Sequence, residues 1–211
     1  MRFNELQIDR LREQICEKMS DFRLAHTLGV EKMAIRLGEI YCPEKIDILR
    51  VAALLHDVTK ELSVAEHTEI YRRHSLEPSS EELSAPATLH SVTAALMIPE
   101  KYPEFASDEV IGAVKYHTVG RENMTLTEKL IFLADYIDET RKYEDCIALR
   151  QEFFSAEPEK MTESEKMKHL DTVILHAFDL TIADILKNRR VLSEATVSAR
   201  NSIIYSLNEN K

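Results

Sequence analysis

Apolar residues recur at approximately helical spacing along nearly the whole chain. In the segment 21–41 the apolar stripe includes Leu24, Leu28 and Leu37, which predicts an amphipathic helix. The second half of the segment 44–57 is apolar on nearly every side, which favours a helix at the centre of a bundle. The same pattern predicts further helices at about 4–18, 63–74, 86–97, 107–117, 130–137, 163–188 and 194–207.

Several of these helices are preceded by capping signals. Thr125 and Glu128 form the T-x-x-E pattern of a capping box, and Thr162 and Glu165 repeat it. Ser107 is the expected N-cap of the segment that follows it. Because each signal lies just before an apolar periodic run, local sequence and hydrophobic pattern agree, and we expect an all-α fold.

Composition supports the same fold class. The chain has 211 residues, of which 44% are hydrophobic, enough for one well-packed domain. Tight turns between strands need Gly and Pro, and the chain has only 4 Gly and 6 Pro, which argues against many strands. We expect a single domain over 1–211, with a core at about 20–145 and a C-terminal helical part at about 146–207 packed on it.

Charge and cysteine usage narrow the classes of function. The net charge of −10 argues against a general affinity for nucleic acid, which needs a basic face. No apolar run approaches the ~18 residues typical of a membrane span, and the N-terminus lacks the apolar core of a signal peptide. The three cysteines are widely separated, as expected of reduced thiols in a cytoplasmic protein.

The helix 44–57 ends in an unexpected group of polar residues, because the apolar run ILRVAALL leads directly into His56 and Asp57. His26 and Asp135 also lie within largely apolar helical segments. Burying such groups is costly unless something compensates them. Imidazole nitrogen and carboxylate oxygen together suit a divalent ion such as Fe, Mn or Zn, so these four residues are candidate metal ligands.

Each candidate also has a purely structural interpretation. A single histidine such as His26 or His90 is usually a core residue whose ring N–H is bonded to a carbonyl. Asp135 could form a buried salt bridge with Arg141 or Lys129. Four independent costly burials are harder to explain than one shared cation that offsets them all, so we favour the metal site.

The six remaining histidines divide into two groups. His169, among charged residues, and His176, expected at a packed boundary, have a structural interpretation, as do His67 and His74. His67 and His74 lie on a polar helix, where we expect them to be solvated. His90 and His117 lie on two helices between the candidate ligands. They could contact phosphate, or they could bind a second metal ion that Asp57 bridges to the first. We favour phosphate contact and keep the second ion as the alternative.

The order H…HD…D resembles the signature of the HD-domain metal-dependent phosphohydrolases. The stretches LLHDVTK, TLHSVTAA, VKYHTVGRENMT and LIFLADYIDETRKYED narrow the resemblance, as does VLSEATVSARNSII near the C-terminus. Together they are similar to the YqeK-like bacterial branch, the symmetrical bis(5′-nucleosyl)-tetraphosphatases, over about 23–204. Mild departures occur at Ser91 and at Asp138 and Glu139, and they concern the pocket wall rather than the metal.

The resemblance implies an HD-domain helical bundle that hydrolyses diadenosine tetraphosphate to two ADP, by attack of a metal-bound hydroxide on phosphorus. Asp57 and Lys60 would be catalytic, with Lys60 clamping phosphate from the helix face of His56 if that helix continues. A solvated helix end is the other interpretation of Lys60. We take iron as the metal, with manganese or another divalent ion as the alternative, and favour one ion over two.

Cations elsewhere in the chain complete the predicted site. Arg23 and Arg141 could bind phosphate through bidentate forks, although a surface position would explain either equally well. Arg200 and Asn201 would contact a nucleotide if the last helix folds back on the cleft. The expected partners are a dinucleoside polyphosphate substrate and ADP product, without nucleic acid or membrane; a homodimer is left open.

Other functions compete with this one. A guanosine tetraphosphate hydrolase would carry an acidic pair two residues after HD, where this chain has HDVTK, and an HD-GYP phosphodiesterase would carry a G-Y-P stretch, which does not occur. A deoxynucleotide phosphohydrolase stays open, because the H…HD…D set does not distinguish it. A non-catalytic nucleotide-binding module with a structural metal also stays open, although a closed structural site needs no additional histidines or cations.

Overall fold

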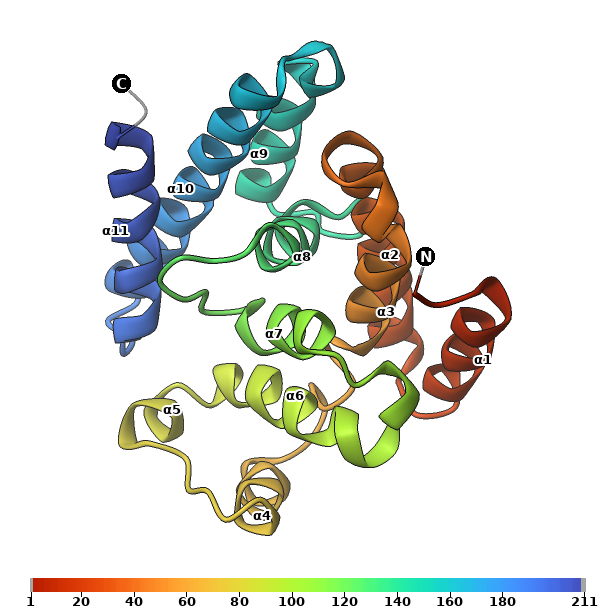
Figure 1. Ribbon diagram of the computed structural model, residues 1–211. Helices are drawn as coiled ribbons and strands as arrows, with labels where there is room; N and C mark the ends of the chain where they lie inside the picture. The colour runs from red at the N-terminus through yellow and green to blue at the C-terminus, as the bar shows by residue number, and fades with distance from the viewer. Residues whose placement is uncertain (1, 210–211) are drawn as a thin grey trace.

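The computed structural model describes residues 2–209, which form eleven α-helices joined by turns and short 3₁₀ segments, with no strand in this range (Figure 1). This confirms the predicted all-α class. The helices in chain order are α1 (Glu5–Cys16), α2 (Asp21–Tyr41), α3 (Ile46–Leu55), α4 (Val64–Arg73), α5 (Ser80–Ser84), α6 (Leu89–Lys101), α7 (Asp108–Tyr116), α8 (Leu126–Ile137), α9 (Glu144–Ser155), α10 (Glu163–Lys187) and α11 (Glu194–Glu209).

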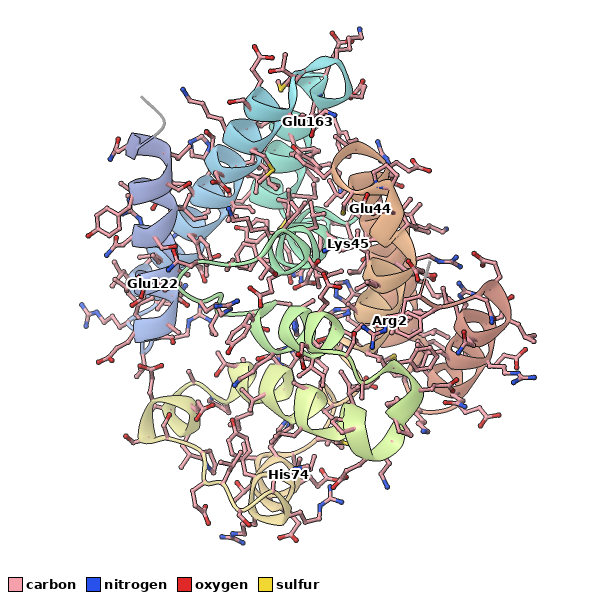
Figure 2. The ribbon with its side chains drawn as sticks, in the orientation of Figure 1. Arg2, Glu44, Lys45, His74, Glu122 and Glu163 are labelled. Atoms are coloured by element: carbon pink, nitrogen blue, oxygen red, sulfur yellow. The ribbon has the colours of Figure 1, made fainter. Side chains whose placement is uncertain are left out.

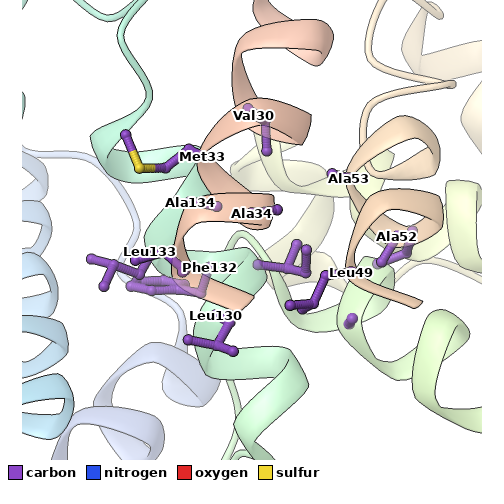
Figure 3. Close-up of a cluster of buried hydrophobic side chains, with 14 of the residues drawn as sticks. Val30, Met33, Ala34, Leu49, Ala52, Ala53, Leu130, Phe132, Leu133 and Ala134 are labelled. Carbon is purple, nitrogen blue, oxygen red and sulfur yellow. The ribbon is translucent and has the colours of Figure 1, made fainter. Parts of the chain in front are cut away.

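Helix α3 lies at the centre of the N-terminal part and packs against α1, α2, α7 and α8. Eight of its ten residues are buried, as expected of a helix that is apolar on nearly every side. Figure 3 shows Leu49 and Ala53 of α3 among the buried side chains of the neighbouring helices, including Ala34 and Leu130. Charged side chains such as Glu44, Glu122 and Glu163 are exposed on the outside of the molecule (Figure 2).

The C-terminal helices form a second layer. Helix α10 packs against α8, α9 and α11, and Figure 1 shows α10 and α11 side by side at the edge of the molecule away from α1. The rings of Phe132 and Phe178 join the two layers, with centroids 4.5 Å apart. The layers share one continuous set of buried apolar side chains.

The predicted capping signals form the expected hydrogen bonds. The side chains of Thr125 and Thr162 accept from the backbone N–H of Glu128 and Glu165, and both glutamates complete their capping boxes. Ser107 caps α7 by accepting from the N–H of Val110 at 3.3 Å. These helix starts are therefore decided by short-range sequence.

Helix α3 ends earlier than predicted, at Leu55. The His56 Nδ1 atom lies 2.6 Å from the carbonyl oxygen of Ala53, which is the oxygen that the N–H of Asp57 would need in a continuing helix. The chain instead makes turns, and the N–H of Lys60 donates to the carbonyl of Asp57 at 3.0 Å. Lys60 therefore reaches the site from a turn, not from the helix face expected for it.

The prediction that His67 is solvated is wrong. Its side chain is buried, and Nδ1 lies 2.8 Å from the hydroxyl of Thr93. The reason is that α4, although polar in composition, packs against α6. His74, at the end of α4, keeps partial exposure and lies 3.2 Å from Glu100; Figure 2 shows it at the outer edge of the molecule.

Candidate metal and phosphate site

The packing around α3 brings the four predicted metal ligands together. His26 projects from α2, Asp135 from α8, and His56 and Asp57 follow α3 directly. The Nε2 atom of His26 lies 3.0 Å from Asp135 Oδ1 and 3.6 Å from Asp57 Oδ2. His56 Nε2 lies 3.4 Å from the same Asp57 oxygen. All but Asp135 are buried, so the predicted constellation exists as a compact group of ligand atoms.

His90 and His117 belong to the same group of side chains. His90 lies in the first turn of α6 and His117 directly after α7, and their Nε2 atoms are 3.0 Å apart. These atoms lie 3.2 and 3.8 Å from Asp57 Oδ1. Asp57 thus presents one oxygen to His26 and His56 and the other to His90 and His117. Two potential three-ligand metal groups share this one carboxylate.

Backbone contacts set the tautomers of His56, His90 and His117. In each ring Nδ1 meets a carbonyl oxygen three residues earlier, and those carbonyls belong to Ala53, Ala87 and Val114 at 2.6, 2.8 and 2.7 Å. A carbonyl only accepts, so Nδ1 must carry the proton, and the neutral ring presents a bare Nε2 lone pair to the site. This is the arrangement of a metal-ligating histidine.

The charges in the group fit a cation. The Nε2 atom of His56 is buried without a hydrogen-bond partner in the described part of the chain. Burial lowers the pKa of His117 well below its ordinary value, and burial also lowers the pKa of His90. Burial raises the pKa of Asp57, but His56 and His90 outweigh it and hold that pKa well below its usual range. The neutral imidazoles of His90 and His117 beside the ionised carboxylate of Asp57 fit a divalent transition ion.

Asp138 is a site residue that sequence reasoning did not identify as one. Its carboxylate is fully buried at the end of α8, with Oδ2 3.4 Å from His26 Nδ1. Its other oxygen accepts from the backbone N–H of Thr140 at 2.7 Å. Burial lowers the pKa of His26, but hydrogen bonds to Asp135 and Asp138 outweigh it and raise the pKa to about 9. A carboxylate on Nδ1 orients the ring and directs Nε2 toward the ligand group.

Gly29 lets the segment carrying Asp138 approach α2 closely. A Cβ atom at this position would lie 2.7 Å from Thr140 Cγ2 and 2.8 Å from Asp138 Oδ1. Both distances are shorter than contacts that real Cβ atoms make, so any larger residue here would force the side chains of Thr140 and Asp138 to shift away from α2. The only sequence signal for the close approach of Gly29 and Asp138 was that Asp138 is an acidic residue three positions after Asp135.

Three of the predicted cations surround the ligand group. The guanidinium of Arg23 donates to Asp57 Oδ2, and Arg141 Nη2 lies 2.5 Å from Asp135 Oδ1. The alternative interpretation of Asp135, an ion pair with Arg141, is therefore also present. Lys60 Nζ lies 3.2 Å from His90 Nε2. The pKa of Lys60 is lowered, because the effect of burial outweighs the opposing effect of the Asp57 and Asp135 carboxylates.

A cavity of about 1320 Å³ opens beside this group. Its walls come from α2 and from the end of α8 through the start of α9, and they include His26, Asp57 and Asp135. Six cationic side chains also line it: Arg23, Lys32, Arg36, Lys60, Arg141 and Lys142. A protein with a net charge of −10 thus gathers positive charge around one cavity, which favours an anionic ligand there.

Arg200 and Asn201 do not line the cavity. Helix α11 packs along α10, where Arg200 Nε pairs with Asp179 at 2.5 Å. The condition set for their predicted nucleotide contact, that the last helix folds back on the cleft, is not met in this arrangement. The physical reason is that the apolar face of α11, including the buried residues Ala199 and Ile203, joins the core.

Residues 23–140 match the family model described as HD domain. The chain belongs to the HD-domain family. It is 36% identical to the symmetrical bis(5′-nucleosyl)-tetraphosphatase of Staphylococcus aureus over 137 residues, covering 64% of this chain and 69% of the relative. It is 26% identical to the protein of the same name from Halalkalibacterium halodurans over 191 residues, covering 88% and 91%. These similarities confirm the resemblance that the motifs indicated.

The fold of this HD-domain protein also has a solved counterpart. A crystal structure from Clostridium acetobutylicum, described as a predicted HD superfamily hydrolase involved in NAD metabolism, superposes with a TM-score of 0.81 at 29% identity. The alignment covers 94% of this chain and 97% of the other. It includes the C-terminal helices as well as the HD-domain segment, so the whole architecture is shared.

Proposed function

We propose that this HD-domain protein is a metal-dependent hydrolase that cleaves diadenosine tetraphosphate symmetrically into two ADP molecules. The names of its relatives supply the reaction. The observation that best supports the proposal is the position of Asp57, because each of its two oxygens faces a pair of histidines. Asp57 lies at the wall of a cavity that six cationic side chains line. A substrate with four phosphates in a row matches that concentration of positive charge.

His26, His56, Asp57 and Asp135 would hold the ion, which we take to be iron, with manganese as an alternative. When bound, a divalent ion of this kind neutralises phosphate charge and makes water a better nucleophile. Lys60 and Arg141 would bind phosphate oxygens beside it, and Asp138 would keep His26 Nε2 directed at the site. Arg23, which bonds to Asp57, would exchange part of that contact for phosphate as substrate enters.

The donor geometry favours a second ion at His90 and His117 over the phosphate contact preferred from sequence. A phosphate contact needs an N–H at Nε2, but each ring carries its proton at Nδ1 on a backbone carbonyl. Lys60 Nζ lies 3.2 Å from His90 Nε2 and the Thr118 hydroxyl lies 3.1 Å from both nitrogens. Even so, two nitrogen lone pairs 3.0 Å apart beside a carboxylate oxygen are a donor set that a divalent ion would fit. We therefore propose that His90, His117 and Asp57 would hold a second ion.

Replacing His90 or His117 with alanine should lower the bound metal from two ions to one per chain. The loss follows because an outer ion held by two imidazoles and one carboxylate oxygen cannot keep its site with one imidazole removed. Metal analysis of each purified variant measures it, with His74→Ala as the control on an unrelated histidine. An unchanged metal content with reduced turnover would restore the phosphate-contact interpretation.

The reaction itself is tested by product analysis. The purified protein, loaded with iron or manganese, is incubated with diadenosine tetraphosphate and its products are separated by chromatography. We expect ADP as the sole nucleotide product, with turnover stopped by a chelator and restored by the metal. AMP plus ATP would contradict symmetrical cleavage. Faster phosphate release from deoxynucleotides would favour the deoxynucleotide phosphohydrolase, and absence of turnover would favour the non-catalytic module.

Two further expectations concern the setting of this reaction. No helix in the described range 2–209 is long and apolar enough to cross a membrane. We propose a cytoplasmic location on the evidence of its scattered free cysteines. Whether the protein forms a homodimer is the second expectation, and it stays open as it was from the sequence.

A further inference from the structure

One face of α2 forms a long wall of the cavity. The lining positions extend from Phe22 through His26 and Gly29 to Arg36, a span of fifteen residues, or roughly 21 Å between its ends at the rise of an α-helix. His26 lies near the Phe22 end of this wall. The cavity therefore continues well beyond the metal ligands, farther than a hydrolytic centre for one phosphoanhydride bond requires.

Exposed aromatic side chains are concentrated at this cavity. Among residues 2–209, three Phe or Tyr side chains are strongly exposed: Phe22 at 79%, Tyr143 at 73% and Tyr205 at 65%. The first two line the cavity, and they come from its two walls, α2 and the start of α9. Large apolar rings left in water beside a binding site are typical of a surface that a ligand covers.

Each of these two rings lies next to a cation that lines the same cavity. The Arg23 guanidinium carbon is 5.9 Å from the centre of the Phe22 ring, and the same guanidinium donates to Asp57. Arg23 Nε is buried without a partner in the described chain, so one donor stays free for an anion. Lys142 precedes Tyr143 on the other wall. Each wall therefore combines an exposed aromatic ring with a positively charged side chain.

We propose that Phe22 and Tyr143 are the stacking platforms for the two nucleobases of the substrate, one on each wall of the cavity. This inference rests on the proposed function, since it assigns the two ends of a dinucleoside polyphosphate to the two rings. Aromatic platforms bind bases through their faces, which every base has. The site would then require a nucleoside but accept adenine and guanine alike.

Stacking is tested by comparing a ligand that has a base with one that has none. In the metal-loaded protein, calorimetry measures the Kd of ADP and of inorganic pyrophosphate for wild type, Phe22→Ala and Tyr143→Ala. Removing either ring should raise the Kd of ADP about 5- to 100-fold, as expected for one lost base stack, and leave that of pyrophosphate unchanged. Tyr143→Phe, which keeps the ring, should bind ADP like wild type, as should Tyr205→Ala, whose ring is exposed outside the cavity.

An unchanged Kd for ADP in one alanine variant would overturn the assignment of the ring that it lacks, and unchanged values in both variants would overturn the proposal. A parallel loss of ADP and pyrophosphate affinity would also overturn it, because the rings would then support the phosphate site and not the base. The binding test of the rings can fail or succeed independently of the test of the hydrolysis reaction. If wild type binds ADP through the rings but releases no ADP from diadenosine tetraphosphate, the nucleoside site stands and the proposed hydrolysis fails.

Discussion

Replacing Asp57 with alanine should abolish metal binding and turnover together while the helical fold persists. Within residues 2–209, Asp57 is the one side chain that faces both pairs of histidines, so its loss removes a ligand from each potential metal group. We expect turnover to fall by more than about 1000-fold, the upper end for loss of a single electrostatic contact. Metal analysis and product formation measure the two losses on the same preparation.

A matched control for this variant is Glu139→Ala. Glu139 lines the same cavity, but its side chain is exposed and pairs with Arg36 instead of the ligand group, so metal content and turnover should stay near wild type. Circular dichroism and a thermal unfolding midpoint check that Asp57→Ala is folded. A folded Asp57→Ala protein with full metal occupancy would contradict the ligand assignment.

Replacing Lys60 with alanine should retain the metal but slow turnover by about 10- to 1000-fold, the range expected when one charge that stabilises the transition state is lost. Lys60 Nζ lies beside His90 and largely out of water, where a charge acts more strongly on phosphate than it does in solvent. Steady-state kinetics on diadenosine tetraphosphate, together with metal analysis of the same sample, gives both quantities.

Lys32 supplies the comparison for Lys60. It lines the same cavity from α2, but its side chain is exposed, so water and salt screen its charge. Lys32→Ala should therefore cost much less in turnover than Lys60→Ala. If the two variants lose turnover equally, Lys60 contributes only to the general field of the cavity and is not a specific phosphate clamp.

Sequence by itself determined most of the secondary structure, because the deciding interactions are short-range. The capping boxes at Thr125 and Thr162 join residues three positions apart, and the all-round apolar character of α3 is visible in one stretch of chain. The set His26, His56, Asp57 and Asp135 was also predictable. Each is a costly polar residue in an apolar segment, and the HD-domain motif gives their order.

Only the tertiary structure decided how these residues act together. Asp138 joins the site because Gly29 lets two distant segments approach closely. Local sequence does not show which polar helix will be covered by another helix. The burial of His67, which results from the packing of α4 against α6, was therefore not predicted. Likewise, the apolar face of α11 joined the core instead of returning over the cleft, and this packing removes Ala199 and Ile203 from water.

The sequence offered a bridging position for Asp57 only as an alternative, and it could not say which oxygen of Asp57 faces which pair of histidines. His90 and His117 lie far from Asp57 along the chain, and only the packing of α6 and α7 near α3 places their Nε2 atoms at Oδ1. Their tautomers depend on backbone carbonyls within hydrogen-bonding reach. Sequence specified which donor atoms were available, whereas the fold decided which of them lie close together, because a metal site depends on distances of a few ångströms between residues that the chain itself keeps apart.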